Sequence, residues 1–439
     1  MGPDTKNVSR ITADRFSRLK ALQRPAPQPD ATGGSESAQE LPDRAPAGAQ
    51  RLATLLGATI CRNDHGEHLS LHSCHGEYAP RTPDAAALHL LLPDAPPEVA
   101  DPKQWLFLDT ETTGLSGGTG TYPFLVGIAW WEGEELKIEQ LFMREYCEEC
   151  SLLSALAERV AERPVLVTFN GKSFDWPLLE TRYRMTRTIP PPTLRAHLDF
   201  LHPARNLWRL KLGSVKLSLL ERHVLDWDRG DDLLSGQIPR LYLDFVRSGY
   251  ADPLVPVFLH NQMDLRGLAG LANRILSILG DEKPAILDGL ERYGLSRICE
   301  RRGEAVRARR SYEDSIGSVL PMETDRAARA ALARLAKRDG DLERARELWK
   351  GILGNSREGY EAYEQLAIYY EHDACNLQQA LAITGNALAQ LRRAHQAGMI
   401  AAEQYRRAKL QFEHRRLRLE RKTGETHLGL FEEGAPPIV

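Results

Sequence analysis

The most constraining feature of the chain is a buried-strand pattern that ends in two acids. The apolar run WLFL at residues 105–108 is followed by Asp109, Thr110 and Glu111. A near-continuous apolar run of this kind is typical of a strand covered on both faces. Asp109 and Glu111 are separated by one residue, so on a strand both side chains face the same side of the sheet. Two like charges in this position need solvent or a cation, and the pair therefore indicates a metal site.

Two later acids complete the pattern. Asp175 follows a second buried run, PVLVTFN at residues 164–170, and Asp264 lies in an amphipathic helical stretch at residues 255–279. Four acids on neighbouring elements can bind two divalent cations in one cleft. Two cations about 4 Å apart are a recurring arrangement for phosphodiester hydrolysis, because they contact both the attacking and the leaving oxygen. The acids therefore predict a metal-dependent nuclease.

The pattern of residues 104–280 predicts an α/β domain. Three strand-like runs come first, and later runs alternate with helical stretches. The expected strands lie at residues 104–109, 123–131, 136–143, 164–170 and 196–201. The expected helices lie at residues 151–162, 175–185, 214–225 and 255–279. A meander followed by alternating strands and helices indicates a mixed sheet flanked by helices.

The residues around the acids carry a resemblance to a known family. TTGL follows the first pair at residues 112–115, and TFNGKSFDWPLL surrounds Asp175. Together with the helical Asp264, these motifs resemble the DEDD family of 3′-to-5′ exonucleases in the RNase H-like superfamily. The second motif is similar to that of the proofreading domain of family B DNA polymerases, and DTETTGLSGGTGTYPFLVGIAWW resembles the YprB-like branch. The resemblance covers about residues 104–280 and implies an RNase H-like fold.

The resemblance also implies a role for each acid. Asp109 would contact both cations, Glu111 and Asp264 would complete the site of the cation that holds the nucleophile, and Asp175 would bind the second, partly through water. The implied cofactors are two Mg²⁺ or Mn²⁺ ions. The implied substrate is the 3′ end of a nucleic acid, DNA or RNA, and more readily a single strand. The residues that the family pattern would place beside this substrate are Thr112, Gly114, Leu115, Asn170 and Phe174.

The general base departs from the family pattern. These exonucleases usually carry a Tyr four residues before the final Asp or a His five residues before it, whereas here His260 lies four residues before Asp264. Residues i and i+4 share one face of a helix, so His260 is expected to point into the cleft with Asp264. A neutral imidazole can accept a proton from water. We predict His260 as the base, with phosphate binding or simple packing as the alternatives.

A basic stretch between the second and third motifs is a candidate for substrate contact. Residues 182–222 contain nine Lys and Arg, including Arg209 and Lys211, with Tyr183 and Trp208 interleaved. Basic side chains beside aromatic rings are typical of single-strand binding, because phosphates pair with the charges and bases stack on the rings. A solvated helix face with routine charge is the alternative.

Beyond Lys283 the pattern is wholly helical and repeats, and residues 284–425 are expected to form a second domain. Equivalent positions recur with a period of 37, namely Gly303, Ala308 and Tyr312 and then Gly340, Ala345 and Trp349. A looser third copy has Ala380 in the Ala position. The pattern resembles tetratricopeptide repeats, which implies a protein partner, and an ordinary helical bundle is the alternative. Eight basic residues within 406–422 suit either a nucleic-acid arm or a charged cap.

The remaining segments carry weaker signals. Residues 1–50 are expected to be a disordered tail, with a short amphipathic helix at its start as the alternative, and residues 426–439 a second tail. The pattern of residues 51–103 predicts a small β-hairpin extension with a turn at residues 64–66. Its Cys and His spacing is looser than that of structural zinc sites, so surface histidines are expected and zinc is the alternative.

Composition excludes some classes of function. The net charge of −3 gives no global attraction to nucleic acid, so such attraction must come from local patches. Six irregularly spaced Cys and the absence of a long apolar run favour a cytoplasmic protein outside the membrane. Two alternatives to the exonuclease are a nucleic-acid-binding or scaffold protein whose nuclease fold is inactive, and a structure-specific endonuclease that uses the same acids.

Overall fold

The computed structural model describes residues 45–114, 118–230, 232–280 and 286–424. Seven strands form one mixed sheet in the order β1-β2-β5-β4-β3-β6-β7. Neighbouring strands are antiparallel from β1 to β3, whereas β3, β6 and β7 run parallel. The strands are β1 (Thr59–Asn63), β2 (Gly66–His75), β3 (Trp105–Thr112), β4 (Pro123–Glu132), β5 (Glu135–Phe142), β6 (Val165–Thr168) and β7 (Ala196–Asp199). The predicted α/β class with a mixed sheet and flanking helices is confirmed.

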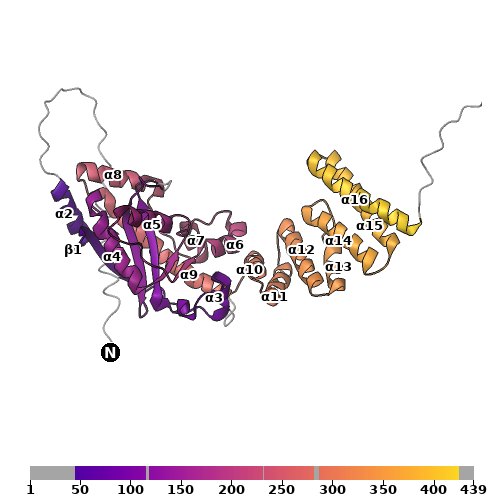
Figure 1. Ribbon diagram of the computed structural model, residues 1–439, viewed down its shortest axis with the longest axis horizontal. Helices are drawn as coiled ribbons and strands as arrows, with labels where there is room; N and C mark the ends of the chain where they lie inside the picture. Colours follow the sequence, from indigo (N-terminus) through magenta and orange to yellow (C-terminus); the bar gives the residue numbers. More distant parts are fainter. Residues whose placement is uncertain (1–44, 115–117, 231, 281–285, 425–439) are drawn as a thin grey trace, which may run out of the picture. The chain divides into compact units, whose positions relative to one another are not determined.

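Helices cover both faces of this sheet (Figure 1). One apolar cluster joins one face to α2 (Ala45–Leu56), α4 (Glu149–Glu162), α5 (Asp175–Thr186) and α8 (Ile238–Ser248). The opposite cluster joins the other face to α3 (Ala85–Leu91), α6 (Leu201–Leu212), α7 (Leu217–Val224) and most of α9 (Val255–Leu279). The start of α9 contributes Val257 and Phe258 to the first cluster. The segment of α9 around residue 260 therefore lies where the two clusters meet.

Strand β3 places its acids in the middle of the sheet. It is antiparallel to β4 and parallel to β6, with Asp109 opposite Gly127 and Glu111 opposite Leu125. Its alternate apolar residues are divided between the two clusters, Trp105 and Phe107 on one side and Leu106 and Leu108 on the other. Strand alternation puts Asp109 and Glu111 on the side of Phe107, which is the side that most of α9 covers.

The hairpin of β1 and β2 continues the same sheet, because β2 pairs with β5 from Leu69 opposite Phe142 to His75 opposite Leu136. Within the described residues, its Cys and His side chains do not gather into a group that could hold a metal. His68 is instead buried and hydrogen-bonded through Nδ1 to Ser151 Oγ at 2.8 Å.

Beyond residue 286 the described chain is helical. The helices are α10 (Gly289–Arg301), α11 (Ala305–Ile316), α12 (Met322–Arg338), α13 (Leu342–Lys350), α14 (Arg357–His372), α15 (Leu377–Gln396) and α16 (Ala402–Thr423). The residues of the 37-residue pattern occupy matching places. Gly303 and Gly340 form the turns of two helix pairs with φ of 80° and 83°, values that favour glycine. Ala308 and Ala345 are fully buried, so the pattern describes repeated helical hairpins.

Helix α10 packs directly against α6. A Cβ at Gly294 would stand 2.8 Å from Leu207 Cα, so only glycine allows this approach. Trp208 is fully buried beside it and donates its Nε1–H to Glu291 Oε1 at 2.9 Å. Among the described helices, none has the length and apolar character needed to span a membrane.

Candidate active site

Three of the predicted site residues meet in one cluster. Glu111 lies at the end of β3, and His260 and Asp264 lie one turn apart on α9. One potential ligand atom from each lies within 4.8 Å of the other two. Across the part of the chain that the structure describes, this is the one group of three or more His, Cys, Asp or Glu side chains close enough to hold a metal ion.

Asp109 is held by an amide that the sequence did not reveal as part of the site. Asn261 is fully buried and donates Nδ2–H to Asp109 Oδ2 at 2.8 Å. Gln140 of β5 donates to Asn261 Oδ1 at 2.8 Å, and Gln262 donates to Gln140 Oε1 at 2.8 Å. A Gln in the buried half of β5, and the Asn and Gln that follow His260, were the available signals. The chain of amides fixes the direction of the Asp109 carboxylate.

Gly127 makes room for this amide chain. It lies opposite Asp109 in β4, and a Cβ at this position would overlap the amide group of Asn261. A glycine within a buried strand often marks such a close approach. The backbone of β4 and the side chain of Asn261 therefore depend on each other.

Gly127→Ala is expected to destabilise the fold by about 1–3 kcal/mol, because the new methyl group must displace the Asn261 amide or the strand. Asp109 would lose its hydrogen-bond donor in either case. Urea-induced unfolding measures the effect. Gly236→Ala is the matched control, since a Cβ at Gly236 meets nothing within 4 Å and is expected to change stability little. Equal stability of both variants would contradict the packing described here.

Asp175 approaches the acids from the first turn of α5. Thr110, the residue between Asp109 and Glu111, donates its Oγ1–H to Asp175 Oδ1 at 2.5 Å. The preceding loop is held by Asp199, whose carboxylate accepts the backbone N–H of Asn170 at 2.9 Å and of residue 172 at 3.0 Å. Asp199 thus positions the loop that leads to Asp175, a role that a sequence motif alone does not specify.

Burial and mutual repulsion act on the acids. Burial, and then the charges of Asp264, Glu111 and Asp175, raise the pKa of Asp109 well above its usual value. Burial raises the pKa of Glu111 to about 8, against the opposing effect of His260. Burial likewise raises the pKa of Asp175 to about 6. A divalent cation would relieve this repulsion, and a set of carboxylate oxygens is what Mg²⁺ and Mn²⁺ prefer. The residues present therefore fit the predicted metal ions.

His260 has a defined orientation. Its Nδ1 lies 2.7 Å from Asp232 Oδ1. Nδ1 therefore carries a proton and donates a hydrogen bond to the Asp232 carboxylate. Its Nε2 faces Asp264 Oδ2 at 3.5 Å and Glu111 Oε1 at 4.0 Å. Burial lowers the pKa of His260, but the Asp232 hydrogen bond and the neighbouring carboxylates outweigh it and raise the pKa to about 8. The ring thus lies among the acids, as its spacing from Asp264 predicted.

Two further charged residues at the site were missed. Arg229, in the segment after α7, donates to Asp264 Oδ1 at 2.5 Å and to Asp232 Oδ2 at 3.0 Å. Its guanidinium also pairs with Glu221 of α7, whose side chain is fully buried. Arg229 and Asp232 lie in a polar segment without a recognisable motif, so no local signal marked them.

The predicted substrate-side residues are spread around the acids. Thr112 is buried, and its Oγ1–H donates to the backbone oxygen of Gly114 at 2.7 Å. Asn170 is exposed and has a φ of 75°. Phe174 is half-buried and immediately precedes α5. Leu115 lies outside the described residues.

The prediction that nucleic-acid bases stack on the aromatic residues of the basic stretch is wrong. Tyr183 and Trp208 are both fully buried, because each lies on the apolar face of its helix. Arg182 is also buried and pairs with Glu149 through Nη2 and Oε2 at 2.6 Å. Lys211 is engaged by Asp288, at 2.6 Å from Nζ to Oδ2. Arg209 is exposed.

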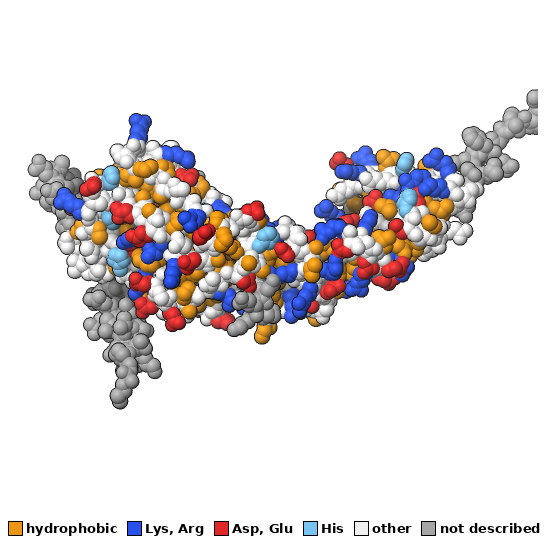
Figure 2. Space-filling model, turned by 60° about the horizontal axis from the view of Figure 1, so that its bottom comes forward, with side chains coloured by type: hydrophobic (Ala, Val, Ile, Leu, Met, Phe, Trp, Pro, Cys, Tyr) orange, Lys and Arg blue, Asp and Glu red, His pale blue; other side chains and the backbone are white. Residues whose placement is uncertain are grey.

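The basic stretch of α16 is partly structural. Arg418, Lys422 and Arg415 all pair with Glu371 of α14, whose side chain is fully buried. These three cations compensate one buried carboxylate, which fits the charged-cap interpretation. On the face seen in Figure 2, Lys and Arg side chains are interspersed with Asp and Glu.

Comparison with known proteins identifies the family. A model of the RNase H superfamily matches residues 106–276, from β3 to α9. The uncharacterized protein YprB of Bacillus subtilis (strain 168) is 32% identical over 285 residues, which make up 64% of this chain and 68% of YprB. The chain belongs to the RNase H-like family. This confirms the predicted superfamily, and an RNase H superfamily domain indicates a nuclease that acts on nucleic acid.

A solved structure also aligns with part of the chain. It is the family B DNA polymerase of the hyperthermophilic archaeon Pyrobaculum calidifontis, at 16% identity and a TM-score of 0.31. The alignment covers 45% of this chain and only 29% of the polymerase. A TM-score this low does not establish a shared fold.

Proposed function

We propose that the chain is a 3′-to-5′ exonuclease that hydrolyses terminal phosphodiester bonds with two Mg²⁺ or Mn²⁺ ions. The observation that carries the proposal is the convergence of Glu111, His260 and Asp264 beside Asp109 within an RNase H superfamily domain. Ordinary surface acids do not explain a buried group of this kind, because uncompensated buried carboxylates cost stability.

Each acid has a place in this function. Asp109, on which the charges of the other three acids act, would contact both cations, while Glu111 and Asp264 would complete one cation site. Asp175, from α5, would hold the second cation after exchanging its Thr110 hydrogen bond for water or metal. When bound, the cations supply the positive charge that stabilises the attacking and leaving oxygens. The protein contributes fixed carboxylate directions, above all through Asn261.

His260 would act as the general base. Without cations, Asp232 and the neighbouring carboxylates hold the pKa of His260 at about 8, and bound cations would offset the carboxylate charges and lower this pKa. Because Nδ1–H is bonded to Asp232, the neutral ring would then present Nε2 as its proton acceptor, and Nε2 faces the acids. The proton taken from the attacking water would then stay on Nε2 until it is released to solvent. Asp232 stabilises the resulting imidazolium, as a carboxylate behind a catalytic His commonly does.

The substrate strand would approach past the loop after β3. Thr112 and Gly114, followed by Leu115, would contact the terminal nucleotide, and Asn170 and Phe174 would line the floor of the cleft. The exposed Arg209 is a candidate for a phosphate contact further along the strand. Lys211 is a weaker candidate because Asp288 already balances its charge.

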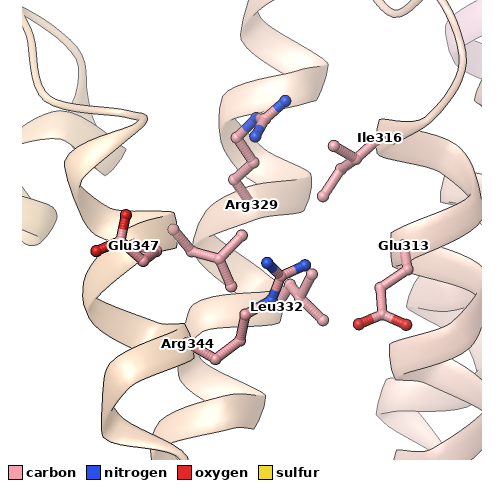
Figure 3. Close-up of a pocket in the computed structure, with 7 residues that line it drawn as sticks. Glu313, Ile316, Arg329, Leu332, Arg344 and Glu347 are labelled. Carbon is pink, nitrogen blue, oxygen red and sulfur yellow. The ribbon is translucent and has the colours of Figure 1, made fainter.

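The helical hairpins of residues 284–425 would form a tetratricopeptide-like domain that binds a protein partner. A pocket of about 270 Å³ opens between α11, α12 and α13 (Figure 3). Its lining combines apolar side chains with both signs of charge, which suits a peptide with polar side chains. Its lining residues are Glu313, Ile316, Arg329, Leu332, Arg344, Glu347 and Leu348.

A timed digestion tests the proposed function. Single- and double-stranded DNA and RNA, labelled at the 5′ end, are incubated with the protein and Mn²⁺. A ladder that shortens by one nucleotide at a time, with release of mononucleotides, is the expected result. Internal cuts would favour an endonuclease instead. No cleavage of any substrate, with Mn²⁺ bound, would favour an inactive nucleic-acid-binding scaffold.

A further inference from the structure

A single arginine joins three carboxylates at the edge of the candidate site. The Arg229 side chain is only 4% exposed. Its Nη2 donates to Glu221 Oε1 at 2.6 Å and to Asp264 Oδ1 at 2.5 Å, and its Nη1 donates to Asp232 Oδ2 at 3.0 Å. Its Nε also donates to Glu221. The fork of a guanidinium can satisfy three such partners in fixed directions, which the ammonium of Lys cannot reproduce.

Both oxygens of Asp264 are thereby assigned. Oδ1 accepts from Arg229, which leaves Oδ2 turned toward His260 Nε2 at 3.5 Å. The two oxygens of Asp232 also have different partners. Oδ2 accepts from Arg229 Nη1, and Oδ1 accepts from His260 Nδ1. Arg229 therefore contacts one site acid directly and reaches the His260 ring through one carboxylate.

The other side of Arg229 is anchored in the core. Glu221 is fully buried in α7, and its carboxylate accepts hydrogen bonds from both Nε and Nη2 of Arg229. Helix α9 leaves space for it at Gly267, where a Cβ would overlap the Glu221 carboxylate. The close approach of α7 and α9 at this glycine brings Glu221 beneath the same helix that carries Asp264. The anchor is thus built into the helix packing.

We propose that Arg229, anchored by Glu221, is a positioning residue that orients Asp264 and the Asp232–His260 pair for cation binding and proton transfer. The inference rests on the proposed function in one respect, that Asp264 is a cation ligand. Asp264 uses one oxygen for Arg229 and offers the other to the cation. An outer partner of this kind typically changes metal affinity by about 10- to 100-fold when it is removed.

A simple charge-balancing role makes the opposite prediction. Arg229→Gln removes a positive charge beside the acids, so pure charge balance predicts tighter Mn²⁺ binding in this variant. The same view predicts that Arg229→Lys, which keeps the charge, binds Mn²⁺ as the wild type does. Positioning by Arg229 predicts that both variants bind Mn²⁺ at least about 10-fold more weakly.

Isothermal titration with Mn²⁺, without nucleic acid, separates these cases. Arg222→Gln is the matched control, because Arg222 is an exposed neighbour on α7 that pairs with the exposed Asp228. It is expected to bind Mn²⁺ as the wild type does. Tighter binding by Arg229→Gln, or wild-type binding by Arg229→Lys, would overturn the inference and leave the proposed function standing.

Two further variants guard against misfolding and indirect effects. Glu221→Gln combined with Arg229→Gln removes both members of the buried pair, so Glu221 is not left in the core as an unpaired charge. This double variant is expected to fold and still bind Mn²⁺ weakly. Arg229→Gln combined with Asp264→Asn is expected to bind no more weakly than Asp264→Asn alone, since both changes act on one carboxylate. Additive losses in that pair would overturn the inference.

The two hypotheses fail in different ways. Wild-type protein that binds Mn²⁺ but cleaves nothing would refute the exonuclease and leave the role of Arg229 intact. Wild-type protein that binds no Mn²⁺ would overturn both, because Asp264 would then not be a cation ligand.

Discussion

Asp109→Asn is expected to lower the nuclease rate by roughly 10³-fold or more, equivalent to about 4 kcal/mol of transition-state stabilisation. Asp109 is proposed to contact both cations, so its loss weakens both proposed cation sites. The digestion assay with Mn²⁺ measures the rate. Asp244→Asn, which removes an exposed acid paired with Arg240 on α8, is the control and should keep the wild-type rate.

The same substitution is expected to stabilise the cation-free protein. Burial and three acidic neighbours raise the pKa of Asp109, which means that its ionised form is unfavourable in the fold. Asn keeps an oxygen that can accept the Asn261 amide but carries no charge. A melting temperature about 2–4 °C above that of the wild type is expected without cation. Mn²⁺ should raise the melting temperature of the wild type far more than that of the variant. A variant that is less stable and still active would contradict the role of Asp109.

His260→Ala is expected to lower the rate by about 10²- to 10⁴-fold, the usual contribution of a general base. Mn²⁺ affinity is expected to change little, because the carboxylates supply the proposed ligands. Added imidazole should restore part of the rate by occupying the vacated space. His89→Ala, a change at a half-buried histidine of α3 that pairs with Glu304, is the control.

Other results for the His260→Ala variant would assign His260 a different role. A wild-type rate in His260→Ala would remove the base assignment and leave the cation sites unaffected. Loss of Mn²⁺ binding in this variant would make His260 a ligand instead. Asp232→Asn should retain folding and lower the rate by about 10- to 100-fold, because Asp232 orients the ring without contacting substrate.

Local rules explain why part of the site could be predicted. The alternation of β3 puts Asp109 and Glu111 on one side of the sheet, and the i, i+4 spacing on α9 puts His260 beside Asp264. Both statements need only the element type, which the apolar patterns indicate. The mixed sheet followed from the same patterns.

The parts that escaped prediction depend on tertiary contacts. Arg229 reaches Asp264 across 35 residues, and Asn261 reaches Asp109 across 152. No spacing rule connects such residues before the fold is known. The predicted stacking on Tyr183 and Trp208 was wrong for a related reason, because a pattern along residues 182–222 does not show which helix face each side chain occupies. Trp208 packs against Glu291 of the helical region instead of facing a nucleic acid.

Anomalous diffraction from crystals grown with Mn²⁺ and a nucleoside monophosphate tests the central claim most directly. The proposed function predicts two peaks about 4 Å apart, bridged by Asp109, with Glu111 and Asp264 on one ion and Asp175 near the other. Asp264 is expected to keep its hydrogen bond to Arg229 in that structure. A single peak, or no peak beside Asp109, would contradict the two-metal account.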